Sequence, residues 1–185
     1  MQIIVAPNPV LRKKAEAVGL DELAGLTESA QEMARLMYES DGCGLAAPQV
    51  GLLKRIIVID TDWSAPDENG ELTNPQEPRF FINPVVKRLW GKKEVADEGC
   101  LSVPGITVPV KRFLNIEVEA IDLDGQTVLV EAEGFEARAF QHELDHLEGI
   151  TMFEHLGPIE RISYLQEYDA AIKAGAKPGD TEFPI

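Results

Sequence analysis

The sequence predicts an α+β fold on two observations. Strand-like segments fill the middle of the chain, between about residues 55 and 132, and helical periodicity is confined to stretches before and after them. A chain of 185 residues is also long enough to form one domain around its own core. We therefore expect a single domain over residues 1–174, followed by a flexible tail over residues 175–185.

The first part of the chain combines an extended segment, a helix and a strand. "QIIVAP" (2–7) is typical of a short strand or extended segment ended by Pro7. Residues 21–40 place apolar side chains three and four apart, which predicts an amphipathic helix ended by Gly42 or Gly44. The continuous apolar run "RIIVID" (55–60) is typical of a buried strand.

Further strands follow a long loop. Residues 61–78 contain three prolines and many polar side chains, which predicts a loop. Three strand candidates come next, at residues 79–86, 105–110 and 115–121. Pro109 places the middle one at a sheet edge. The turn sequence "DLDG" then leads to "QTVLVEA" (126–132), so the last two strands should form a hairpin.

Helical patterns return over residues 135–149 and 159–174. The first contains "QHELDHLEG" (141–149), in which His142 and His146 are four residues apart and therefore lie on one face of a helix. A different face carries apolar side chains that we expect to pack on the sheet: Phe140, Leu144 and Leu147. The pattern predicts a metal site, and the alternative is a surface helix with two incidental histidines.

Charge and composition exclude several classes of function. The net charge of −15 repels phosphate, so we expect no direct nucleic-acid specificity. No apolar run approaches membrane-spanning length, and the N-terminus lacks the layout of a signal peptide, which predicts a cytoplasmic protein without a membrane partner. Two cysteines are too few for a disulfide scaffold.

A catalytic metal site of the zinc type takes three protein ligands, so a third is required beside the histidines. In the extended metalloprotease pattern the third ligand is a histidine, but Met152 occupies that position and His155 is out of register. Glu167, on the last helix, is a second option. Cys100 in "DEGCLSVPG" (97–105) is the better candidate, because its acidic and glycine neighbours are not a core pattern. A thiolate and two imidazoles suit Zn²⁺, Fe²⁺, Co²⁺ or Ni²⁺ rather than Mg²⁺ or Ca²⁺.

Three separated segments resemble the motifs of the peptide deformylase family, in the same order. They are "GCGLAAPQVG" (42–51), "EGCLS" (98–102) and "QHELDH" (141–146). The opening "PNPVLRKKAEAV" also resembles the family's N-terminal segment, so the match runs from about residue 5 to about residue 156. Two departures stand out: Cys43 replaces a usual aliphatic residue beside the substrate, and "MFEHL" (152–156) replaces a more usual acid-and-arginine ending.

The resemblance implies small mixed or antiparallel β-sheets packed around a central helix that carries the HExxH motif. It implies a hydrolase that removes the N-formyl group from the N-terminal methionine of nascent polypeptides and releases formate. One divalent metal ion would be held by Cys100, His142 and His146, with Fe²⁺ as the native ion and Zn²⁺, Ni²⁺ or Co²⁺ as alternatives. The partner would be a nascent formyl-Met polypeptide, with transient ribosome contact left open.

The resemblance also assigns roles around the metal. Glu143 would accept and return a proton, while the Gln49 amide and the Leu101 backbone N–H would stabilise the charged oxygen. The residues matched to positions near the substrate are Gly44, Glu98 and Arg138. Two alternatives remain open from the residues alone: a zinc endopeptidase and a metal-stabilised binding module without activity.

Overall fold

The computed structural model describes residues 1–64 and 73–181 of the chain. The strands form one five-stranded antiparallel sheet in the order β1-β2-β3-β4-β5. Their bounds are β1 Gly44–Ala46, β2 Ile56–Ile59, β3 Arg79–Cys100, β4 Val103–Ile121 and β5 Thr127–Glu133. The α-helices are α1 Leu23–Glu39, α2 Gly134–Leu147 and α3 Pro158–Lys173, and short 3-10 helices are η1 Pro9–Arg12, η2 Ala47–Val50 and η3 Met152–His155. The α+β prediction is confirmed, with one bent sheet in place of several small ones.

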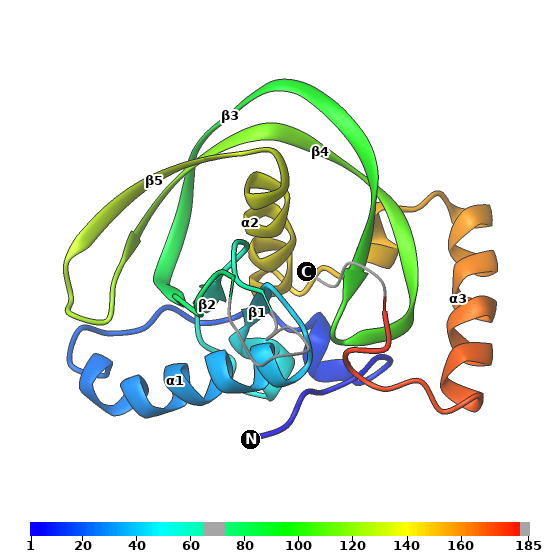
Figure 1. Cartoon of the computed structure of the whole chain (residues 1–185), viewed down its shortest axis with the longest axis horizontal. Coiled ribbons are helices and arrows are strands. Elements are labelled where there is room, and N and C mark those ends of the chain that lie inside the picture. Colours follow the sequence, from blue (N-terminus) through cyan, green and yellow to red (C-terminus); the bar gives the residue numbers. More distant parts are fainter. Residues whose placement is uncertain (65–72, 182–185) are drawn as a thin grey trace.

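The β3–β4 hairpin is the longest feature of the fold and arches over α2 (Figure 1). Its tip is a tight turn, at which Cys100 pairs with Val103. Register shifts interrupt the ladder at several points, and such irregularities let a long hairpin bend. The hairpin therefore curves around the central helix and delivers its tip to one end of it.

Two of the predicted strands prove to be parts of one. Residues 105–110 and 115–121 both belong to β4, and residues 79–86 are only the start of β3. The prediction that Pro109 lies at an edge is confirmed: Pro109 pairs with Asp97 of β3, whereas β5 pairs only with the Asn115–Ile121 part of β4. A proline without an N–H group can occupy a strand at such a position.

Helix α2 lies at the centre of the molecule. Phe140, Leu144 and Leu147 pack in one cluster with sheet residues such as Ile57 and Phe81, so the predicted sheet-facing side is confirmed. The rings of Phe81 and Phe140 meet edge to face, with centroids 4.9 Å apart. The opposite side of the helix, which carries both histidines of the HExxH motif, is buried as well.

The two outer helices differ in how far they are buried. Helix α1 matches the prediction for residues 21–40 and packs Met33 and Met37 against Leu45 and Ile56. Helix α3 lies outside the β3–β4 hairpin, and in its described residues only Tyr168 is fully buried (Figure 1). No helix in the described part of the chain combines the length and apolar character needed to cross a membrane.

The N-terminal segment is extended but pairs with no strand. Its backbone connects two parts of the fold, because Ile4 N donates to Gln49 O at 2.7 Å and Ala6 N donates to Ser102 O at 2.8 Å. The predicted loop 61–78 has no helix or strand in its described portions, while 65–72 fall outside the described residues. Of the predicted tail, Thr181 accepts a hydrogen bond from Gly105 N at 2.8 Å, and 182–185 lie outside the described residues.

Candidate metal centre

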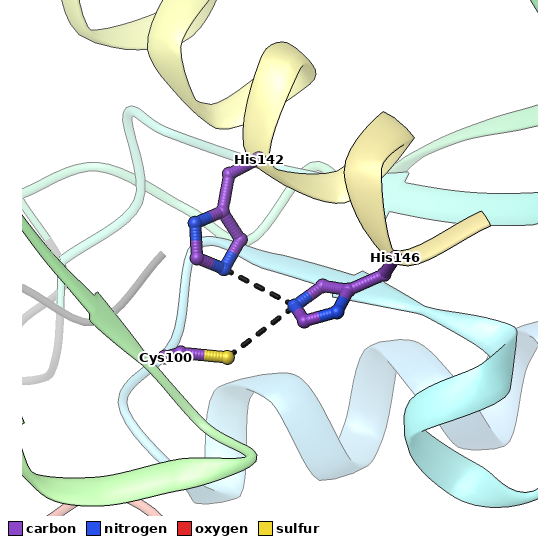
Figure 2. A group of neighbouring side chains, drawn as sticks. All are labelled: Cys100, His142 and His146. Carbon is purple, nitrogen blue, oxygen red and sulfur yellow. Dashed lines mark hydrogen bonds between the residues drawn. The ribbon is translucent and has the colours of Figure 1, made fainter. Parts of the chain in front are cut away.

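The three predicted ligands meet between the hairpin tip and the central helix (Figure 2). Cys100 Sγ lies 3.3 Å from His146 Nε2, and the Nε2 atoms of His146 and His142 are 3.2 Å apart. One candidate ligand atom from each residue lies within 4.8 Å of the other two, and all three residues are buried. The arrangement therefore places one sulfur and two imidazole nitrogens around a common point.

Local structure explains how each ligand reaches this point. Cys100 is the last residue of β3, where the hairpin turns, and His142 and His146 project from successive turns of α2. The candidate ligands thus come from two elements, β3 and α2, which also meet through the rings of Phe81 and Phe140. Among the described residues, this is the single group of histidine, cysteine and acidic side chains close enough to hold a metal ion.

Burial disfavours the charged forms of His146 and Cys100. Burial lowers the pKa of His146 to about 3, with the neighbouring His142 adding to the effect. Burial also raises the pKa of the Cys100 thiol, and the Glu143 carboxylate raises it further. A neutral imidazole keeps the lone pair that a metal ion needs, and a bound divalent ion deprotonates a coordinating thiol.

Glu143 is the clearest sign that a further group belongs here. It is fully buried, and neither carboxylate oxygen has a hydrogen-bond partner among the described residues. Burial raises its pKa well above the usual value, and the charge on Glu98 acts in the same direction. An unpaired buried carboxylate is costly, so the site fits a cation and a polar molecule beside it. Together with the borderline-soft donor set, this matches a divalent metal of the iron-to-zinc series.

Gly44 makes room for this carboxylate. A Cβ atom built on Gly44 would lie 2.7 Å from Glu143 Oε1 and 3.0 Å from its Cγ. Real Cβ atoms essentially never come within 3.0 Å of another atom, so any other residue at this position would force the Glu143 side chain to shift. The backbone of "GCGLAAPQVG" (42–51) therefore passes close to the glutamate of the HExxH motif.

Gln49 presents its amide nitrogen to the site. Its Oε1 accepts from Ala46 N at 2.6 Å, which fixes the orientation of the amide. The Nε2 atom then lies 3.7 Å from Cys100 Sγ, and the side chain is wholly buried. Leu101 follows Cys100 directly in the hairpin turn, so its backbone also lies beside the centre.

Glu98 lies behind the ligands, where its carboxylate has four contacts from three side chains. Arg112 donates to its two oxygens at 2.9 and 3.0 Å, Arg138 donates to Oε1 at 2.8 Å, and His142 Nδ1 lies 2.9 Å from Oε2. Burial alone would raise the pKa of Glu98, but the His142 and Arg112 hydrogen bonds lower it overall. A His142 that donates from Nδ1 directs the Nε2 lone pair toward Cys100.

Three nearby positions bear on the other sequence hypotheses. Glu167 is exposed on α3 and Met152 packs in the apolar cluster of Cys100, so neither completes a protease-type ligand set. Cys43 is buried against Ala139, and its pKa is raised to about 12 by burial and by the charge of Glu143. Cys43 therefore lies at the border of the centre.

Sequence reasoning missed Arg112, which binds Glu98, and Asp145, which binds Arg112. Arg112 is 6% exposed and also donates to Asp145 at 2.6 Å. Asp145 lies inside the HExxH segment, and this position in the sequence could have marked it as a residue near the site. Arg112 had none, because one basic residue in an alternating strand looks like a solvated side chain until the chain is folded.

Comparison with known proteins places the chain among deformylases. A family model described as polypeptide deformylase matches residues 1–162. Peptide deformylase from Desulforudis audaxviator is 42% identical over 157 residues, which cover 83% of this chain and 91% of that protein. Peptide deformylase 1 from Clostridium perfringens is 45% identical over 150 residues, covering 80% and 92%.

Solved structures agree with this result. The peptide deformylase of Legionella pneumophila superimposes with a TM-score of 0.79 at 31% identity, covering 94% of this chain and 95% of that one. For the peptide deformylase of Thermotoga maritima the TM-score is 0.74 at 38% identity, with 85% and 97% covered.

Proposed function

Because this chain belongs to the polypeptide deformylase family, we propose that Cys100, His142 and His146 hold the divalent metal ion on which the family's reaction depends. The chain is a hydrolase that removes the N-formyl group from N-formyl-methionyl polypeptides. The observation that carries the proposed site is the buried Cys/His/His group with the unpartnered Glu143 carboxylate beside it. When bound, the ion would supply Lewis-acid chemistry to water and to the formyl oxygen.

We assign the proton transfers to Glu143. Its carboxylate accepts the proton of the attacking water and passes it to the departing amine, which leaves formate as the second product. The raised pKa caused by burial suits this role, because a group that must both accept and release a proton works best when its pKa approaches the working pH.

The charge that develops on the formyl oxygen needs hydrogen-bond donors. We assign this to the Gln49 amide and the Leu101 backbone N–H, which flank Cys100 from η2 and from the hairpin turn. The Ala46 hydrogen bond to Gln49 Oε1 supports the assignment, since it leaves the NH₂ end of the amide toward the centre. Such preorganised donors contribute on the order of 10²-fold or more in rate.

The three residues matched to substrate positions divide into two groups. We propose that Gly44 borders the substrate, since it lies against Glu143 on β1. The polar groups of Glu98 and Arg138 are already engaged inside the protein, and Arg138 also donates to Val110 O and Glu94 O. We therefore propose that Glu98 and Arg138 shape the site from behind His142 rather than through their own polar contacts to the substrate.

The identity of the ion and the location of the enzyme complete the proposal. We propose Fe²⁺ as the native ion, with Zn²⁺, Ni²⁺ and Co²⁺ as substitutes that the same donors accept. We place the enzyme in the cytoplasm, where nascent formyl-Met chains are made. Transient ribosome contact is included, although the mixed charges of α3 do not favour a strong grip on RNA. The working domain is residues 1–174.

The substrate is tested by comparing formyl-Met and acetyl-Met peptides. Formate release from the formyl peptide should far exceed acetate release from the acetyl peptide, and casein should remain uncut. Equal rates on the two peptides, or casein cleavage, would contradict the proposal and favour the endopeptidase. Metal analysis of anaerobically purified protein, paired with the activity of each metal form, tests the choice of Fe²⁺.

A binding module without activity is the second candidate, and ligand count argues against it. Structural zinc sites are usually closed by four protein ligands, whereas three are brought together among residues 1–64 and 73–181. A purely structural site also has no use for a buried carboxylate without a partner. Absence of formate release from protein with a full complement of metal would favour the binding module.

A further inference from the structure

A continuous chain of polar contacts runs from the ligand His142 to a partly exposed histidine on η3. Glu98 contacts His142, and Arg112 binds both oxygens of Glu98. Arg112 Nη1 then donates to Asp145 Oδ2 at 2.6 Å, and His155 Nε2 lies 2.6 Å from the same oxygen. This series of polar contacts ends at His155, whose side chain is 28% exposed.

His155 stands in the segment that departs from the usual family ending, and the reaction proposed above does not use it. Since a carboxylate oxygen can only accept, the short contact requires the His155 Nε2–H group to donate to Asp145. Arg112 Nη1 is 3.3 Å from the same nitrogen, so two donors converge on one acceptor. Asp145 is therefore clamped from both sides.

The position of Asp145 affects the position of Arg112, because the Arg112 guanidinium binds the carboxylates of both Glu98 and Asp145. Arg112 uses Nε and Nη2 for Glu98 and Nη1 for Asp145, so its plane is fixed by two carboxylates at once. Loss of the Asp145 contact would leave Arg112 held only by its two hydrogen bonds to Glu98, without the second carboxylate that fixes its position. Glu98 would then lose the geometry in which Oε2 meets His142 Nδ1, because the same oxygen accepts from Arg112.

The carboxylates and guanidiniums in this series of contacts are equal in number, so their charges balance. Two carboxylates, Glu98 and Asp145, face two guanidiniums, Arg112 and Arg138. A buried charge that loses one partner is strongly destabilised, so each member holds the others in place. His155 adds a directional hydrogen bond at the open end of this group, where solvent would otherwise compete for Asp145.

We propose that His155 is a positioning residue for the metal centre, acting through Asp145, Arg112 and Glu98 on the orientation of the ligand His142. This inference rests on the metal site proposed above. Removal of the hydrogen-bond partner of a ligating histidine typically lowers metal affinity or activity by about 10- to 100-fold. His155 is three contacts further out than Glu98's own bond to His142, so the expected effect is smaller, about 3- to 10-fold.

The test compares His155→Leu, which removes the donor, with His155→Gln, whose amide nitrogen can replace the Nε2–H donor. Lys111→Gln is the matched control, because Lys111 adjoins Arg112 on β4 but is exposed. Each full-length protein is loaded with Co²⁺, and three quantities are measured: the cobalt absorption bands, the rate of Co²⁺ loss to excess chelator, and kcat and KM for a formyl-Met peptide. The absorption bands report ligand geometry directly.

For His155→Leu we expect shifted cobalt bands, Co²⁺ loss faster by about 3- to 10-fold, and a lower kcat with KM within about twofold. His155→Gln should restore all three values, and Lys111→Gln should match wild type. Unchanged bands and loss rate in His155→Leu, or equal defects in the Leu and Gln variants, would overturn the inference.

A second comparison tests whether His155 acts through Asp145. Asp145→Asn keeps an acceptor of the same shape, and we expect the defect of Asp145→Asn/His155→Leu to equal the larger single defect, because both act through one chain of contacts. Additive defects would overturn the inference. If the wild-type chain itself fails to bind Co²⁺ through Cys100, the proposed metal site fails first and takes this inference with it.

Discussion

Glu143 and Cys100 both face the proposed metal centre, and the roles proposed for them differ. Glu143→Gln should retain the metal, because the amide has a similar shape and Glu143 lies outside the ligand group. It should abolish most turnover, because an amide cannot accept and return the proton. Cys100→Ala should first lose metal, with activity falling as a consequence. Metal content and formate release are measured on the same preparations.

The opposite pattern would reverse the ligand assignment. Full metal in Cys100→Ala together with metal loss in Glu143→Gln would show that the glutamate, and not the thiolate, completes the ligand set. A Cys100→Asp variant serves as a further control, since an oxygen ligand should restore some binding with a preference for harder ions.

Gln49 can be separated from metal binding in the same way. Gln49→Leu keeps approximate bulk but removes the NH₂ group that lies 3.7 Å from Cys100 Sγ. Turnover should fall by about 10²-fold or more while the metal stays bound. Near-normal turnover with full metal would remove Gln49 from the stabilisation of the formyl oxygen.

Gly44 gives a prediction that depends on space rather than on chemistry. In Gly44→Ala the new methyl group would overlap Glu143 Oε1, so the carboxylate must move. We expect kcat to fall at least tenfold with metal retained, since a displacement of about 1 Å at a catalytic group can cost on the order of 10²-fold. Gly25→Ala is the control, because nothing lies within 4 Å of its added Cβ.

Among individual residues, the three proposed metal ligands could be predicted from the sequence, whereas the ion pair behind them could not. Cys100, His142 and His146 follow from spacing and motif, and the structure brings them together. The role of Arg112 could not be predicted, because its partly buried ion pair with Asp145 depends on the register of both β4 and α2. Nothing in the local sequence of Arg112 distinguishes it from a solvated residue.

At the scale of elements, α2 carries both core residues and the two histidines of the proposed metal site, and Phe140 tests the core separately. Phe140 is fully buried and packs on Phe81, so Phe140→Ala should lower the free energy of unfolding by about 3–5 kcal/mol. Phe135→Ala on the same helix should change it by less than about 1 kcal/mol, since Phe135 is 47% exposed. Urea unfolding of metal-free protein measures both, and similar losses would mean that Phe140 is not a core anchor.

The helices could be predicted closely and the long strands could not. Residues 21–40 and 135–149 carry a clear helical period, and α1 and α2 begin and end within about two residues of it. β3 contains an exposed, charged stretch from Lys87 to Asp97 with no apolar alternation to mark it as a strand. Pairing with β4 holds this stretch in place, and such pairing is a property of two segments at once.

At the scale of the whole molecule, the end of the described chain returns to the hairpin. Removing residues 175–185 would delete the Gly105–Thr181 hydrogen bond and the approach of Gly179 to Ser40. One hydrogen bond contributes about 0.5–1.5 kcal/mol, which for a chain of this size corresponds to roughly 2–4 °C in Tm per kcal/mol. We expect a lower Tm with formate release retained.

A chain that ends at Thr181 is the matched comparison, since it keeps both contacts and lacks only residues 182–185. Its Tm should stay close to that of the full chain. Loss of formate release in the shorter variant would contradict the assignment of the working domain to residues 1–174.

Because the proposed ligands are far apart in the sequence, the stability of the folded chain should depend on the concentration of free metal. Cys100 and His146 are 46 residues apart, so an unfolded chain offers no ready site, and an ion held by both residues would bind the folded state selectively. At a free concentration one hundred times Kd, such selective binding adds about 2.7 kcal/mol to stability. This contribution is set by the free ion in the cell and not by the sequence. A shortage of metal would therefore remove activity and at the same time increase the unfolded fraction that proteases can degrade.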